Sequence, residues 1–221
     1  MEIRKFRKNY DLDLIPASHQ GITLGDLAWD PLLRPPVFSR KGMPNHIFTA
    51  FLDADLMDER EWSAMRETCR QTPCMEAQLA SGTVDVSVEL VNELRHPELG
   101  KIQGEFITEK LSKFTFSNLQ VRAMSDLVRI RVDSYLEKMK ASRWSEYDGR
   151  IRRVFMITEL YYGTIRLVVE QRFSAELDTQ LKKTALKAIS RTEGQHAVEY
   201  EFSHNDVPFA MRLERIRNFN G

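Results

Sequence analysis

Residues 152–163 read Arg152-Arg-Val-Phe-Met-Ile-Thr-Glu-Leu-Tyr-Tyr-Gly163, and this stretch decides the fold class. It is rich in β-branched and aromatic residues, and the run continues through Ile165, Leu167 and Val169 with an apolar residue at every second position. Side chains of a strand point alternately to its two faces, so the pattern predicts a long strand over 152–173.

Two other runs alternate in the same way and predict a second pair of strands. In the run 83–91 one face is polar and the other is apolar, with Val84, Val86, Val88 and Leu90 on the apolar face. A second alternating run begins with Phe114 and Phe116. We expect 83–91 to pair with 113–123 in an antiparallel sheet.

The end of the chain predicts a closing hairpin. Its first arm alternates and carries Val198, Tyr200 and Phe202. Residues 203–206 have the composition of a turn, and the second arm returns over 207–216. We expect 196–217 to pair with 153–173.

Four segments predict helices, and they separate the strands without the strand–helix–strand rhythm of a parallel sheet. They are 2–9, 58–71, 126–141 and 175–190. Asp58 and Glu61 form a capping-box pattern, and Ser125 precedes the third helix. The expected fold class is therefore α+β: a mixed, mainly antiparallel twisted sheet with surrounding helices, in a single domain over 1–221.

Three finer expectations concern side chains and a further strand. The apolar stripe of the third helix is expected at Leu127, Ile130, Leu136 and Met139. In the fourth helix, Leu177, Leu181 and Ile189 are expected to face inward, and Lys182, Lys183 and Lys187 outward. The apolar run 47–52 predicts a short strand.

Composition limits the classes of function. The 221 residues are 42% hydrophobic and 29% charged, and 32 basic residues balance 32 acidic ones. A nucleic-acid partner is not expected, because there is no overall basic excess. The two cysteines, Cys69 and Cys74, are too few for a disulfide framework, and no apolar run is long enough for a membrane-spanning helix. The chain is expected to be cytoplasmic when soluble.

Motifs of enzyme chemistry are missing from the sequence. There is no Gly-rich phosphate loop after a strand, no zinc-protease His pair and no Cys-x-x-Cys, and the five histidines are scattered. Nothing places a nucleophile beside a base. We therefore expect no catalytic residue, no metal and no cofactor.

Two basic segments are candidates for contact with anionic lipid. Residues 1–8 carry Arg4, Lys5, Arg7 and Lys8 around two apolar residues, as in amphipathic elements that dock on membranes. The alternative is an ordinary surface helix. The second is a proline-rich loop that combines Leu33 and Phe38 with Arg34, Arg40 and Lys41. The alternative for this loop is that it folds onto the core.

Several short motifs occur in a familiar order. They are Leu14-Ile15-Pro16, the strand Gly82 to Leu90, Lys101-Ile-Gln-Gly104, Ser125 before a helix, Val154-Phe-Met-Ile-Thr-Glu159 and Phe209-Ala-Met-Arg-Leu213. Together they cover nearly the whole chain and resemble the N-terminal pore-forming domain of the gasdermins. The strongest local match is 154–159, which resembles that family's apolar strand ending in Thr-Glu.

The resemblance implies a membrane pore-forming effector of cell death. Such domains bind acidic inner-leaflet phospholipids of the plasma membrane, oligomerise, and refold two regions into β-hairpins of a large barrel. Transferred to this chain, the hairpins are 83–91 with 113–123 and 153–173 with 196–217. The implied membrane-inserting residues are Val84, Val86, Val88, Leu90, Phe114, Phe116, Val154, Met156, Val198, Tyr200 and Phe202.

The expected partners are acidic phospholipids and other subunits, which are either further copies of the chain or a variant of the same family. No C-terminal inhibitory domain is visible, so the organisation resembles fungal and bacterial members without a large repressor. Alternation is equally typical of a half-buried soluble sheet, so a second hypothesis stays open. It is a non-lytic α+β interaction module that binds a protein or an anionic lipid surface.

Overall fold

The computed structural model describes residues 7–15, 21–29, 38, 44–77, 82–85, 111–142, 154–169, 187–191, 197–204, 207–216 and 219. The chain divides into two compact units, each assembled from three segments. The first unit consists of Met1–Gln20, Met75–Val121 and Tyr161–Ala210. The second consists of Gly21–Cys74, Arg122–Leu160 and Met211–Gly221.

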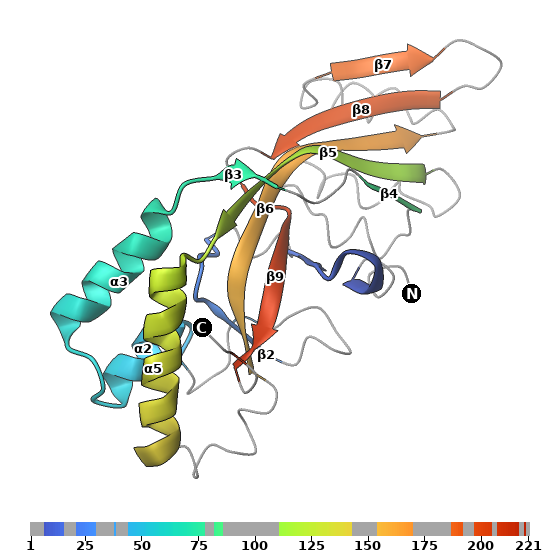
Figure 1. The fold of residues 1–221 in the computed structure, drawn as a ribbon. Coiled ribbons are helices and arrows are strands. Elements are labelled where there is room, and N and C mark those ends of the chain that lie inside the picture. The colour runs from blue at the N-terminus through green and yellow to red at the C-terminus, as the bar shows by residue number, and fades with distance from the viewer. Residues whose placement is uncertain are drawn as a thin grey trace. The chain divides into compact units, whose positions relative to one another are not determined.

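The described residues contain both helices and antiparallel strands, which confirms the α+β fold class (Figure 1). The helices are α2 (Ile47–Asp53), α3 (Glu59–Gln71) and α5 (Asp126–Ser142), and residues 7–10 are also helical. The strands are β1 (Asp13–Leu14), β2 (Leu27–Trp29), β3 (Met75–Glu76), β4 (Gly82–Asp85), β5 (Leu111–Ala123), β6 (Val154–Val169), β7 (Lys187–Arg191), β8 (Ala197–His204) and β9 (Ala210–Arg215).

Two long strands, β5 and β6, organise the sheet. The hydrogen-bonded order is β1-β9-β6-β5-β3, with β2 and β8 also paired to β6, β4 to β5, and β7 to β8. In Figure 1, β7, β8, β6 and β5 follow one another in that succession. Both expected strand pairings are present as antiparallel pairs, β4 with β5 and β6 with β8.

The expected hairpin within 197–216 is wrong in its pairing. Strands β8 and β9 do not pair with each other; both pair with β6. The backbone N–H of Phe209 donates to the carbonyl of Tyr161 at 3.0 Å, just after β8 has ended opposite Gly163. One very long strand can therefore accept two consecutive partners along its length, which the turn composition of 203–206 does not reveal.

The expected strand at 47–52 is also wrong, because this run forms helix α2. The N-cap is His46, whose ring Nδ1 accepts a hydrogen bond from the N–H of Phe48 at 3.1 Å. The side chains of Ile47, Phe48 and Phe51 are fully buried. A continuous apolar run has no period that separates a strand from a buried helix, so burial decides here.

Helix α3 begins and ends where the sequence predicts. Asp58 is the N-cap, and its carboxylate accepts a hydrogen bond from the N–H of Glu61 at 2.7 Å. The helix ends at Gln71, two residues before Pro73. Both limits follow from local chemistry, since a cap satisfies a free N–H and proline disfavours helical geometry in the residue before it.

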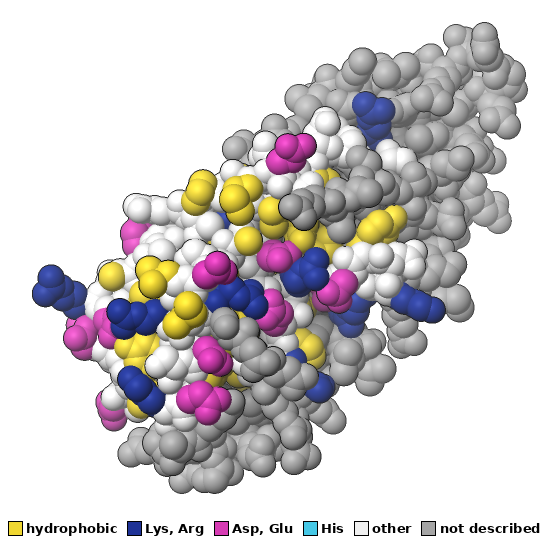
Figure 2. Space-filling model, viewed as in Figure 1, with side chains coloured by type: hydrophobic (Ala, Val, Ile, Leu, Met, Phe, Trp, Pro, Cys, Tyr) yellow, Lys and Arg dark blue, Asp and Glu magenta, His cyan; other side chains and the backbone are white. Residues whose placement is uncertain are grey.

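Helix α5 lies where it was expected, but its buried stripe differs. The side chains that face the core are Val128, Val132, Tyr135, Leu136 and Met139. They follow the helical spacing of four, three, one and three residues. Leu127 and Ile130, which were expected in the stripe, are 70% and 58% exposed. Figure 2 shows apolar side chains scattered among charged ones of both signs on the face with α3 and α5.

The end of the expected helix 175–190 is a strand. Residues 187–190 belong to β7, in which Lys187 stands opposite Glu201 and Ile189 opposite Glu199 of β8. Residues 175–186 lie outside the described part of the chain. The alternation of lysines and apolar residues fits either period over so short a segment, and the pairing with β8 decides it.

Candidate functional site

The N-terminal basic segment is tied to the first unit by an ion pair. The guanidinium of Arg7 donates to the carboxylate of Asp13, with 2.7 Å between Nε and Oδ1. Asp13 lies in β1 and is only 6% exposed. Burial raises the pKa of Asp13, and the hydrogen bond and charge of Arg7 oppose that rise. Lys8 is exposed, whereas Arg4 and Lys5 lie outside the described residues.

The proline-rich loop is represented by one described residue, Phe38. Its side chain is 7% exposed and belongs to the core, so the expectation of an apolar tip in contact with lipid is wrong for Phe38 in this structure. An aromatic ring gains more from burial in the protein than from exposure to water, which favours the folded-in alternative. Leu33, Arg34, Arg40 and Lys41 lie outside the described residues.

The first expected hairpin has a paired base in the first unit. Val84 stands opposite Phe114, and Gly82 opposite Phe116, in the antiparallel pair β4–β5. This register joins two of the residues that were expected to share a lipid-facing side. The remaining residues expected on this face, Val86, Val88 and Leu90, lie outside the described residues.

The second expected hairpin is paired over a longer stretch. Every apolar position that was singled out in β8 stands opposite an apolar position of β6: Val198 opposite Val169, Tyr200 opposite Leu167, and Phe202 opposite Ile165. Polar residues occupy intervening pairs, such as Arg166 with Glu201. Paired positions share a face of a sheet, so β6 and β8 agree on one apolar face.

Val154 and Met156 occupy a different setting from the other expected membrane-inserting residues. They lie in the second unit, opposite Trp29 and Leu27 of β2, and both are buried. The neighbouring Ile157 and Thr158 are fully buried as well, so this end of β6 is covered on both faces. Val154 and Met156 thus belong to the second unit, whereas Val198, Tyr200 and Phe202 belong to the first.

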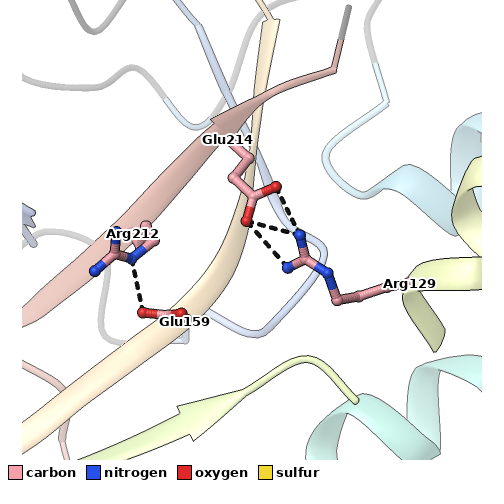
Figure 3. A network of polar contacts seen from close by, with 4 residues as sticks. All are labelled: Arg129, Glu159, Arg212 and Glu214. Atoms are coloured by element: carbon pink, nitrogen blue, oxygen red, sulfur yellow. Dashed lines mark hydrogen bonds and ion pairs between the residues drawn. The ribbon is translucent and has the colours of Figure 1, made fainter. Parts of the chain in front are cut away.

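A network of charged residues in the second unit was missed by the sequence reasoning. Figure 3 shows Arg212 and Glu214 of β9 reaching Glu159 of β6 and Arg129 of α5, respectively. Arg212 donates to Glu159 at 2.8 Å, and Arg129 binds both carboxylate oxygens of Glu214 at 2.9–3.0 Å. The alternation of Arg212 and Glu214 signals a charged strand face, but nothing in the sequence identifies their partners.

Aspartate, histidine and cysteine are common in catalytic sites, and the second unit contains Asp26, His46 and Cys69. His46 is 1% exposed, and burial lowers its pKa to about 3. Its Nε2 lies 3.0 Å from the carbonyl of Leu24, so both ring nitrogens bind backbone groups. Burial raises the pKa of the Cys69 thiol to about 12. A neutral thiol and a fully committed imidazole support a structural role.

Within the described ranges, no cluster of His, Cys, Asp and Glu side chains has the arrangement of a metal site. In the same ranges, no helix has the length and apolar character needed to cross a membrane. No protein-family model and no curated protein sequence matches the chain.

Proposed function

We propose that this chain is a membrane pore-forming protein that binds acidic lipids, assembles with further copies and inserts β-hairpins. The observation that supports the proposal best is the pair of antiparallel strand pairs β4–β5 and β6–β8 in the first unit. They coincide with the two segments that resemble the insertion hairpins of gasdermins.

The strand pairs have the chemistry that a barrel wall needs. Apolar positions of β8 are matched by apolar positions of β6, and charged or polar positions alternate with them except at Val168, which stands opposite Glu199. In a transmembrane barrel, alternate residues of a strand face the lipid and the water-filled interior. Strands β6 and β8 could therefore form part of a barrel wall while keeping the same residues paired. The edges of a hairpin are satisfied in lipid only when copies join into a closed sheet, which makes assembly part of the proposal.

Basic residues near the N-terminus would provide the first contact with the membrane. Lys8 is exposed, whereas Arg7 is engaged by Asp13. Each cation near an anionic surface contributes about 1 kcal/mol of attraction, so binding should weaken as salt is added. If these residues make the first contact, the chain should bind anionic vesicles and not neutral vesicles.

The test is dye release from vesicles of phosphatidylcholine with and without phosphatidylserine. We expect the purified chain to empty the anionic vesicles and to leave the neutral vesicles intact. Co-sedimentation of the same samples separates binding from leakage. Binding without any dye release would contradict pore formation and support the alternative, a non-lytic module that docks on anionic surfaces.

A further inference from the structure

Helix α5 presents two neighbouring large apolar side chains to solvent. Four large apolar side chains are exposed among the described residues, and of these Leu127 and Ile130 are the two that share an element. They are 70% and 58% exposed, and their separation of three residues places them side by side on one face of the helix. This face points away from the buried stripe that contains Val128 and Val132.

The exposed face continues along α5 with the spacing of a two-helix contact. Ser134 and Glu137 follow Ile130 at steps of four and then three residues, and both are exposed. Alternate steps of three and four residues define the a and d positions of a coiled-coil heptad. An α-helix drifts from this repeat by only about 40° over two heptads, so the four positions stay on one face. We call Leu127, Ile130, Ser134 and Glu137 the ridge.

Opposite charges line the two sides of the ridge. In the heptad register that places Leu127 at a, the g positions are Asp126 and Asp133, and the e positions are Arg131 and Lys138. When two such helices pack in parallel, each g residue faces the e residue that lies five positions further along the partner helix. Asp126 would then face Arg131, and Asp133 would face Lys138, so each of these pairs joins an acid to a base.

The same charges disfavour an antiparallel pair and a lipid surface. Antiparallel helices present the same flank to each other, so acids would face acids and bases would face bases, at a cost in binding energy. Three acids, Asp126, Asp133 and Glu137, stand on or beside the ridge with two bases. Anionic lipid attracts surfaces with a basic excess, and this surface has none.

Both flanking bases remain accessible to a partner. Arg131 donates to Glu61 of α3 at 3.1 Å, and its side chain is still 56% exposed. A guanidinium carries five N–H donors, so one contact leaves others for a second carboxylate. The ammonium of Lys138 lies 5.0 Å from the centre of the Tyr135 ring, and Lys138 is also exposed. Side chains that are already held in place lose less freedom when they bind.

We propose that the ridge is a self-association surface, through which two copies of the folded chain pack with their α5 helices parallel and in register. Leu127 and Ile130 lie at the centre of the contact, and the acid–base pairs lie at its sides. Two-fold symmetry makes each of these pairs occur twice. A second copy is the occupant because one helix supplies both members of every complementary pair. The contact forms in solution without a membrane and is independent of the proposed pore function.

Glu137 keeps the association weak. In a parallel dimer it stands at a d position beside its own copy, and like charges at that position repel. The contact is also smaller than a standard interface, so we expect a dissociation constant of roughly 10–100 µM. At about 1 µM the chain is then largely monomeric, and substitutions on the ridge should leave the unfolding of such dilute protein unchanged.

Sedimentation analysis of the purified chain between about 1 and 200 µM tests the association, which mass action makes dependent on concentration. We expect a shift from monomer to dimer. Leu127→Ser combined with Ile130→Ser should abolish the dimer and leave the melting temperature of dilute protein unchanged, because both side chains are exposed. A chain that stays monomeric throughout would overturn the proposal. A dimer that persists in the double variant would place the interface elsewhere and would also overturn it.

A substitution that strengthens the dimer gives an independent test. Glu137→Leu replaces the repelling pair by an apolar one and should tighten the dimer roughly tenfold. Glu67→Leu makes the same change at an exposed position of α3, away from the ridge, and is the matched control. Tightening by Glu137→Leu alone supports the ridge as the interface. Equal tightening by both variants would show non-specific apolar association and would overturn the proposal.

Reversal of the flanking charges tests the parallel arrangement. Asp133→Lys and Lys138→Asp each place like charges opposite one another in the parallel dimer, so each variant alone should associate roughly tenfold more weakly. In an equal mixture of the two variants, the heterodimer again joins opposite charges in both pairs, and association should return. In an antiparallel dimer a single reversal only exchanges one like-charged pair for another. Single variants that associate like the original chain, or a mixture that does not recover, would therefore overturn the parallel pairing.

Discussion

At the scale of single residues, the half-buried Asp26 and the buried His46 are neighbours whose protonation affects stability in opposite directions. An isolated β-bridge joins them in the second unit. Burial raises the pKa of Asp26 from 3.8 to about 6 and lowers that of His46 from 6.5 to about 3. Both groups are therefore more easily neutral in the folded chain than in the unfolded chain.

The two shifts predict opposing pH dependences. The unfolded chain protonates His46 below pH 6.5, but the folded chain does so only near pH 3, so His46 lowers stability as the pH falls through this window. The folded chain protonates Asp26 near pH 6, but the unfolded chain only below 3.8, so stability from Asp26 is lost as the pH rises. Each effect reaches about 1.4 kcal/mol per pH unit.

Single substitutions should separate the two effects between about pH 4 and pH 6. Asp26→Asn leaves the His46 effect, so its free energy of unfolding should fall as the pH decreases. His46→Asn keeps a capping side chain and leaves the Asp26 effect, so its free energy of unfolding should rise instead. Urea denaturation at several pH values measures both slopes. Slopes of the same sign in the two variants would contradict the assignment.

Gly25 offers a second prediction at this scale. Its φ is +89°, and an added Cβ would lie 2.7 Å from the ring of His46. Gly25→Ala should therefore lower the free energy of unfolding by about 1–3 kcal/mol through backbone strain and displacement of the capping ring. Gly21→Ala is the control, because nothing lies within 4 Å of its Cβ position. A shift in melting temperature that is equal for both variants would contradict this reading of Gly25.

At the scale of elements, helix α5 shows what a periodic pattern can and cannot specify. Its bounds follow from Ser125 and from the length of the periodic segment. Its buried face does not, because Leu127 and Ile130 lie on one side of the helix and Val128 and Val132 on another, so the sequence supports two apolar stripes. The partner surface selects the stripe with Val128 and Val132, and only the packed structure contains that information.

The selected stripe predicts unequal costs of truncation along α5. Leu136 is 1% exposed, so Leu136→Ala should lower the free energy of unfolding by about 2–5 kcal/mol through lost burial and a cavity. Leu127→Ala removes the same atoms from a side chain that is 70% exposed, so it should change the free energy of unfolding by less than about 0.5 kcal/mol. Chemical denaturation compares them. A cost at Leu127 that matches the cost at Leu136 would place Leu127 in an interface between copies.

The ion pairs of Figure 3 connect elements that lie far apart in sequence. Arg129 and Glu214 are about a quarter exposed and make a two-oxygen contact, which is stronger than an open surface pair. A double-mutant cycle of Arg129→Met and Glu214→Gln should give a coupling energy of about 1–2 kcal/mol. Arg70 and Glu67, 3.8 Å apart and more than half exposed, form the control pair with little coupling. Coupling that is equal in both cycles would contradict the role of the network.

At the scale of the whole molecule, the sequence predicted the fold class and the two main strand pairings. Both succeed because period-two runs are long enough to define a face, and paired runs must agree in register. The predictions for 47–52 and 187–190 were wrong because these segments contain too few residues to show a period.

The candidate site was only partly predictable. The cations of the N-terminal segment are visible in the sequence, but the engagement of Arg7 by Asp13 is not, because it depends on how β1 returns beside residues 7–10. Phe38 stands in a proline-rich segment that also carries basic residues, and its burial likewise depends on tertiary contacts. Local chemistry therefore identifies which residues are candidates for lipid contact, and packing decides which of these candidates are already engaged within the protein.

The contact between Arg7 and Asp13 leads to a final prediction about membrane binding. Asp13 holds a cation that would otherwise attract anionic lipid, so Asp13→Asn should strengthen binding to vesicles that contain phosphatidylserine. One additional free cation contributes about 1 kcal/mol, or roughly a fivefold gain in affinity by co-sedimentation. Asp11→Asn makes the same change in net charge two residues away, and asparagine fits its φ of +54°. It should strengthen binding less. In an Arg7→Gln background the gain from Asp13→Asn should disappear, because no cation is left to release; a gain that persists there, or that Asp11→Asn reproduces in full, would show that net charge and not release of Arg7 controls the affinity.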